Sequence, residues 1–141
     1  MNRRIQTREF RIADYAGALR LWRRVKGVEI AEGDDKRGVA QFLARNPGLS
    51  RVAVDGSAIV GVVLCGQDGR RGHIYHLAVD PAYQGKKLGS RLVDECIKAL
   101  RQTGVKRAII LVAEDNLQGV KFWKRQGWEE IRGALAMGID V

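Results

Sequence analysis

The chain has 141 residues, 45% of them hydrophobic, which suffices for one buried core and predicts a single domain spanning residues 1–141. Lys and Arg number 25 against 16 Asp and Glu, so the formal charge of +9 favours polyanions such as nucleic acid, an anionic membrane or a phosphate-rich ligand. The basic residues are scattered, without the interleaved aromatics of RNA-binding motifs, so nucleic acid is not the partner we expect.

The cysteines and the apolar segments indicate the cellular compartment in which we expect the protein. Cys65 and Cys96 each lie in an apolar pattern, outside any CxxC pair or His/Cys cluster, so we expect buried, reduced thiols and no metal site. The first residues lack the apolar stretch of a signal peptide, and no run reaches the ~18 apolar residues of a membrane span. These features predict a cytoplasmic protein without a membrane partner.

The first half of the chain alternates helical and strand patterns. The expected elements are a strand at 4–9, helices at 13–25 and 39–46, and strands at 50–54, 57–65 and 73–79. Asp14 is suited to capping the first helix, and Asp55-Gly56 is a hairpin signal because both positions tolerate positive φ. The later strands should therefore form an antiparallel meander.

In the second half of the chain, the spacing of apolar residues changes from the strand pattern to the helical pattern. Apolar residues from Leu88 to Leu100 mark an amphipathic helix, and the run at 107–113 reads as a buried strand parallel to 73–79, because a crossover connects them. A last helix at 119–126 and a hairpin of 128–141 complete the order. The predicted fold is α/β, with a mixed, mostly antiparallel sheet of about six or seven strands, a central parallel pair and about four flanking helices.

Residues 83–90, YQGKKLGS, join the fourth strand to the amphipathic helix. The first turn of a helix exposes unpaired N–H groups and the positive end of the helix dipole, which together favour an anion. Gly85 and Gly89 let a ligand approach the backbone, and Lys86 and Lys87 add positive charge. The stretch is typical of a pyrophosphate-binding loop.

The stretch from 74 to 128 resembles the GNAT superfamily of acyl-CoA-dependent N-acetyltransferases. Its signature R/Q-x-x-G-x-G/A is similar to QGKKLG, with Lys87 where the middle glycine is usual, and NLQGVKFWKRQGW resembles the family's N-x-x-A-x-x-F-Y-x-x-x-G-F. Element order agrees throughout, and GQDGRRGHIYHLAV resembles a small bacterial subgroup of uncharacterised acetyltransferases.

The resemblance implies that acetyl-CoA is the co-substrate and assigns residues to its binding. Backbone amides of the fourth strand would hold the pantetheine arm, the loop would hold the pyrophosphate, and the last helix would line the channel. The implied residues are Leu77, Ala78, Val79, Gln84, Gly85, Lys86, Lys87, Leu88, Gly89, Ser90, Asn116, Phe122 and Trp123. Arg91 and Lys124 are further candidates for the phosphates of coenzyme A.

The resemblance also implies direct attack of a primary amine, from a small molecule or a protein N-terminus or lysine, on the thioester. The Val79 amide would stabilise the oxyanion. His76, and after it His73, are candidates for the base, because histidine titrates near neutral pH. Strand alternation places His76 on the face opposite His73. Trp123 stands where the family commonly has a tyrosine acid.

The acceptor side carries no motif, although the acidic segment at 29–35 fits a cationic amine. Two other classes of protein remain open. A catalytically silent module that senses acyl-CoA would explain Lys87 and the missing tyrosine, whereas a nucleic-acid-binding domain would explain the charge. An exposed final strand edge would also suit a homodimer.

Overall fold

The computed structural model describes residues 5–141, which form two compact units, the first ending at Ile110 and the second spanning Leu111–Val141. The predicted first strand starts at Arg4, which lies outside the described residues. The first unit contains the sheet and three α-helices, and the second contains one. Across residues 5–141, no helix combines the length and apolar character that a bilayer crossing requires.

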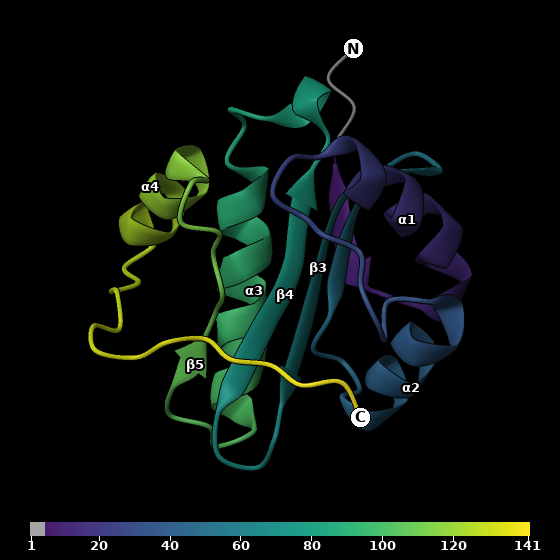
Figure 1. Ribbon diagram of the computed structural model, residues 1–141. Helices are drawn as coiled ribbons and strands as arrows, with labels where there is room; N and C mark the ends of the chain where they lie inside the picture. Colours follow the sequence, from purple (N-terminus) through teal and green to yellow (C-terminus); the bar gives the residue numbers. More distant parts are fainter. Residues whose placement is uncertain (1–4) are drawn as a thin grey trace. The chain divides into compact units, whose positions relative to one another are not determined.

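The first unit is built on a mixed sheet (Figure 1). Its elements, in chain order, are β1 (Gln6–Glu9), η1 (Ile12–Asp14), α1 (Tyr15–Arg24), α2 (Lys36–Arg45), β2 (Arg51–Asp55), β3 (Ala58–Gln67), β4 (Gly72–Val79), η2 (Pro81–Tyr83), α3 (Leu88–Gln102) and β5 (Ala108–Ile109). The strand order follows the chain, and every pairing is antiparallel except that of β4 with β5. The predicted fold class and the parallel crossover are confirmed.

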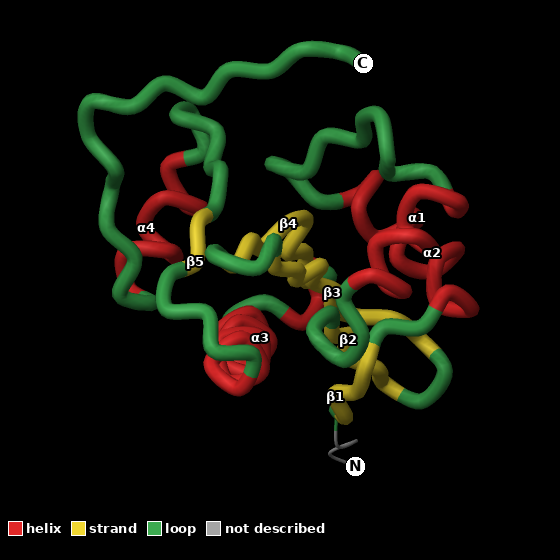
Figure 2. Tube along the Cα trace, turned by 90° about the horizontal axis from the view of Figure 1, so that it is seen from below, coloured by secondary structure: helices red, strands yellow, loops and turns green. Residues whose placement is uncertain are grey.

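The helices cover the two faces of this sheet, with α1 and α2 on one side and α3 on the other (Figure 2). The core on the α1/α2 side consists of Phe10, Ala18, Leu21, Trp22, Val39, Val52, Val62, Leu64 and Ala78. On the other side, α3 buries Leu88, Leu92, Val93, Cys96 and Leu100. Cys65 and Cys96 are both free and buried, and their mutual hydrogen bond together with burial raises the pKa of the Cys96 thiol. That thiol therefore stays protonated and unreactive.

Local polar contacts differ from the prediction at two turns. The Asp14 side chain does not cap α1, because its carboxylate accepts from the Arg11 N–H at 2.9 Å and pairs with Arg8 at 2.7 and 2.8 Å. In the β2–β3 hairpin, Asp55 still belongs to the strand and pairs with Ala58. The two turn residues are 56 and 57, and the glycine at 56 supplies the positive φ of 61°.

The second unit contains α4 (Leu117–Arg125), whose N-cap is Asn116. The predicted hairpin of 128–141 is wrong, because these residues include no strand. Their backbone has no partner strand, and Leu135, Met137 and Ile139 stay about nine-tenths exposed. The strand predicted at 107–113 likewise shortens to the two residues of β5. The described sheet therefore has five strands rather than six or seven.

Candidate active site

The loop that follows β4 is tied to the rest of the first unit at several points. Asp80 caps η2 by accepting from the Ala82 N–H at 3.0 Å and pairs with Arg24 of α1 at 2.8 Å. The side-chain amide of Gln84 donates to the Val79 carbonyl at 3.1 Å. These contacts fix the entrance to YQGKKLGS on both α1 and β4.

A second anchor of the loop joins Tyr83 to the end of β2. The Tyr83 hydroxyl donates to Oδ2 of Asp55 at 2.5 Å, and the other carboxylate oxygen, Oδ1, is buried without a hydrogen-bond partner. The Lys86 ammonium lies 5.4 Å from the centre of the Tyr83 ring, within the range of a cation–π contact. The sequence gives no sign of this anchor, because the two residues lie 28 positions apart.

Gly85 and Lys87 both adopt positive φ, at 81° and 61°. Lys87 is the N-cap of α3, with left-handed backbone, and its side chain caps none of the N–H groups of the first turn. The first intrahelical bond runs from the Arg91 N–H to the Lys87 carbonyl at 3.1 Å. The start of α3 thus has the uncapped backbone of an anion site, and its lysine occupies a conformation that favours glycine.

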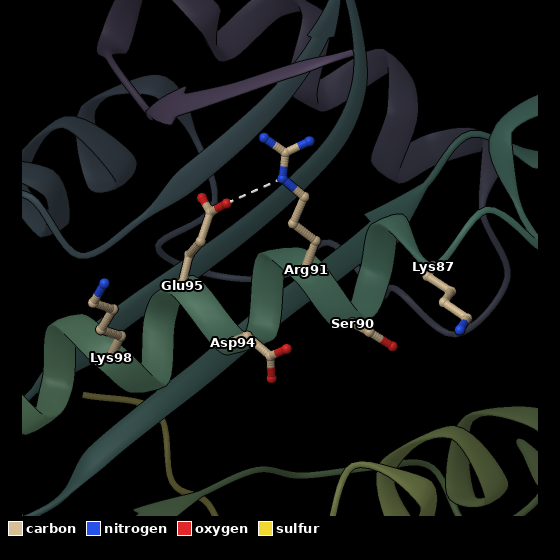
Figure 3. A pocket seen from close by; sticks show the side chains of 6 residues that line it. All are labelled: Lys87, Ser90, Arg91, Asp94, Glu95 and Lys98. Carbon is tan, nitrogen blue, oxygen red and sulfur yellow. Dashed lines mark ion pairs between the residues drawn. The ribbon is translucent and has the colours of Figure 1, made fainter. Parts of the chain in front are cut away.

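The basic side chains near this loop differ in whether they already bind other residues of the protein. Arg91 donates to the Ile5 carbonyl and to Thr7, and its Nε lies 3.4 Å from Glu95, which also pairs with Arg51. An open pocket beside α3 is lined by Lys87, Ser90, Arg91, Asp94, Glu95 and Lys98 (Figure 3). Because the Arg91 guanidinium is held by β1 and Glu95, Lys86 and Lys87 are the better candidates for phosphate contacts.

The edge of β4 that faces β5 is open over most of its length. Parallel pairing covers only Gly72 and His73 among the described residues. The Asp80 N–H donates to the Val60 carbonyl, and Ala78 is opposite Val62, so the amides at even positions point to β3. Alternation directs the N–H groups of residues 77 and 79 away from β3, so of the three implied amides only these two face the edge that β5 leaves unpaired.

A β-bulge interrupts β4 just before those amides. Val62 pairs with Ala78 and Leu64 with Tyr75, so two residues, His76 and Leu77, oppose the single residue between Val62 and Leu64. His76 has φ of 53°, which is uncommon for any residue other than glycine. Such strained positions persist where the surrounding structure holds them, and they cluster at functional sites.

The bulge also overturns the predicted separation of the two histidines. The His76 ring packs edge-on against Trp22 of α1 at 5.2 Å, and its carbonyl accepts from the Trp22 indole at 2.9 Å. Tyr75, which stacks on His73, contacts Phe42 of α2. Since α1 and α2 cover the same face, His73, Tyr75 and His76 all lie on that face, because the extra residue of the bulge reverses the alternation.

The two candidate bases have different partners. His76 Nε2 lies 2.8 Å from Oδ2 of Asp34, in the loop between α1 and α2, whereas His73 Nε2 lies 3.7 Å from Asp68 beside the β3–β4 turn. His73 is four residues from Leu77, or about 13 Å along a strand. His76 directly precedes Leu77, so it is the histidine adjacent to the open amides.

The second unit contains the three remaining residues implied by the resemblance. Oδ1 of Asn116 accepts from the Gly119 N–H at 3.1 Å, so Asn116 caps α4. A Cβ at Gly119 would lie 2.5 Å from the Asn116 side chain, which explains the glycine. The Trp123 ring packs against Phe122 and Trp128, each at 5.2 Å. Its indole N–H is not an acid, so this unit offers no tyrosine for the leaving thiolate.

The comparisons with known proteins agree with this architecture. The acetyltransferase (GNAT) family profile matches residues 14–128, and the chain belongs to this family. An acetyltransferase from Pectobacterium atrosepticum is 28% identical over 127 residues, which are 90% of this chain and 89% of the relative. The protein is thus an acyl-CoA-dependent acyltransferase, specifically an acetyltransferase.

Two solved structures show the same fold. A GNAT-family acetyltransferase from Staphylococcus aureus superposes with a TM-score of 0.79 at 17% identity, covering 94% of this chain and 89% of that one. The protein Rv2747 from Mycobacterium tuberculosis, solved with CoA, gives 0.70 at 23% identity, covering 94% and 76%. At these identities the likeness concerns the fold.

Proposed function

We propose that this protein transfers the acetyl group of acetyl-CoA to a primary amine by direct attack, with the first unit supplying both the phosphate loop and the base. The observation that carries the proposal is the bulge in β4. It places His76 immediately before the two amides that face the open strand edge. A proton acceptor and oxyanion donors therefore adjoin one another on a single strand.

In the proposed reaction, His76 removes a proton from the acceptor ammonium, and the neutral amine attacks the thioester carbonyl. The C–N bond forms while negative charge develops on the carbonyl oxygen, which the Val79 N–H stabilises by a hydrogen bond. The C–S bond then breaks, the nitrogen gives its second proton to water to leave the neutral amide, and the coenzyme A thiolate takes a proton from water. Water suffices in this step because a thiolate is a stable leaving group, so the absence of a tyrosine at 123 is tolerated.

The loop at 84–90 is proposed to hold the pyrophosphate of acetyl-CoA on its backbone amides, with Lys86 and Lys87 close to the phosphates. Its ties to α1, β2 and β4 mean that little ordering is required on binding, which favours affinity. Asn116, Phe122 and Trp123 remain the residues that the family resemblance implies for the pantetheine. The acceptor is an amine of a small molecule or of a protein N-terminus or lysine.

The first test is the binding of acetyl-CoA, measured by calorimetry in about 0.15 M salt, where loose surface attraction is screened. We expect acetyl-CoA to bind more tightly than dephospho-CoA or ATP. Equal binding of the three ligands, or none, would show that charge alone directed the assignment. Salt-sensitive affinity for nucleic acid, unaffected by acetyl-CoA, would then point to the other partner.

The second test is turnover with a panel of polyamines, aminoglycosides, amino acids and peptides, followed by thiol release and by the mass of the product. We expect His76→Ala to lower kcat by about a hundredfold, the lower range for general base catalysis, while acetyl-CoA binding is kept. His73→Ala is the matched control and should retain its rate. A full rate for His76→Ala from pH 6 to 9 would exclude this base.

A catalytically silent acyl-CoA sensor is the second candidate, and two features favour it. Lys87 adopts a left-handed conformation in the phosphate loop, and Trp123 replaces the usual acid. Tight acetyl-CoA binding without thiol release on any amine would support this candidate.

A further inference from the structure

Asp34 reaches the ring of His76 although 42 positions separate the two residues. Its Oδ2 atom lies 2.8 Å from His76 Nε2 and also accepts from the Ala31 N–H at 2.9 Å. The Tyr15 hydroxyl donates to the Asp34 backbone carbonyl at 2.6 Å, and the Asp34 N–H donates to the Ala31 carbonyl. Asp34 is therefore held from two directions, by α1 and by its own turn.

The contact determines which nitrogen of His76 carries the proton. An ionised carboxylate only accepts hydrogen bonds, so the nitrogen facing it, Nε2, must donate, and Nδ1 keeps its lone pair. The side chains of His76 and Asp34 are only 19% and 16% exposed, so water competes weakly for the bond. The His76 carbonyl is held as well, by the Trp22 indole.

We propose that Asp34 is a positioning residue for the reaction, fixing His76 in the tautomer whose Nδ1 takes the proton of the acceptor amine. The proposal rests on the proposed function and extends it to the α1–α2 loop. When Nδ1 is protonated, the imidazolium faces the Asp34 carboxylate at 2.8 Å, and the neighbouring negative charge stabilises it. The segment at 29–35 therefore supplies Asp34, which positions the base, in addition to its acidic surface.

The electrostatic surroundings of the ring are simple. The groups that contact it or its partner come from α1, which supplies Trp22 and Tyr15, and from the α1–α2 loop, which supplies Asp34. Desolvation and the nearby Asp35 raise the pKa of Tyr15, so its phenol stays neutral at working pH. Asp35 and Arg23 also act on Tyr15, and Asp34 is the charged group that contacts the His76 ring directly.

The test compares Asp34→Asn with Glu129→Gln, which removes the same charge from an exposed carboxylate outside the acidic segment at 29–35. An asparagine amide can donate to Nε2 and so favour the opposite tautomer. We expect Asp34→Asn to lower kcat at least about tenfold, but no more than His76→Ala does, with KM for acetyl-CoA unchanged within about twofold. Glu129→Gln should match the wild type.

The outcomes separate this inference from the proposed function. A wild-type kcat in Asp34→Asn, together with a slow His76→Ala, would overturn the role of Asp34 alone. A fast His76→Ala would overturn both. Nitrogen-15 NMR of the wild-type protein, with His76 assigned through His73→Ala, tests the tautomer without any change at Asp34. We expect a protonated Nε2 and an unprotonated Nδ1 at pH 8, and the reverse would refute the proposal even if Asp34→Asn failed to fold.

Discussion

Replacing Lys87 by glycine should stabilise the protein, although glycine usually weakens a chain. The lysine has φ of 61° and ψ of 22°, a left-handed conformation that costs a residue with a Cβ about 1 to 2 kcal/mol. Glycine loses roughly 0.4 to 1 kcal/mol through the greater freedom of the unfolded chain. We therefore expect the free energy of unfolding of Lys87→Gly to be about 0.5 to 1 kcal/mol higher than that of Lys87→Ala. Both variants lose the same charge, so the difference between their free energies of unfolding reports the cost of the backbone conformation.

Urea denaturation of the two variants measures this difference. Lys86 provides the control in the same loop, because its φ is not positive. There the order should reverse, with Lys86→Ala at least as stable as Lys86→Gly. Equal stability of the two Lys87 variants, or an advantage for alanine, would refute the strain argument.

The same variants test whether the strained lysine hinders acetyl-CoA. The loop is anchored before the ligand arrives, so we expect Lys87→Gly and Lys87→Ala to bind acetyl-CoA alike, each more weakly than the wild type because a charge near the phosphates is lost. A large gain in affinity for Lys87→Gly would show that the native loop resists its ligand and would favour the silent sensor.

Two further predictions concern stability. Tyr83→Phe leaves the Asp55 carboxylate without its one described hydrogen bond. The variant should lower the free energy of unfolding by about 2 kcal/mol, or Tm by roughly 4 to 8 °C, and should also weaken acetyl-CoA binding. A Tm within about 1 °C of the wild type would contradict this anchor. The hydrogen bond from Arg8 lowers the pKa of the Asp14 carboxyl below its unfolded value, so its contribution is complete above about pH 4 and is lost as pH falls through the folded pKa. The difference in unfolding free energy between the wild type and Asp14→Asn, followed by urea denaturation, should therefore shrink from pH 6 to pH 3, and a constant difference would contradict the assignment.

Local sequence patterns sufficed for most of the elements in this protein. The period of apolar residues located α1, α2 and α3, and β-branched runs located β2, β3 and β4, because each pattern reflects one buried face. The crossover between strands 73–79 and 107–113 predicted their parallel pairing. The motif at 83–90 located the start of α3, since the chemistry of a helix N-terminus depends on a few adjacent residues.

The prediction was wrong where a strand depends on a partner distant in sequence. Residues 128–141 alternate apolar and polar positions as a strand would, yet they are unpaired, and alternation alone provides no hydrogen-bonding neighbour. The bulge at His76 was equally hidden, because one extra residue opposite β3 is a property of the register between two strands. That extra residue reversed the face on which the histidine lies.

The family, the mixed sheet and the phosphate-loop segment follow from the amino-acid sequence, because these depend on short motifs and local periodicity. The tertiary structure alone decided which residues meet. Asp34 contacts His76 across 42 positions and Tyr83 contacts Asp55 across 28, and neither pair has a sequence signature. Such contacts arise from the packing of α1 and η2 against the sheet, so they form only when segments distant in sequence come together in the folded protein.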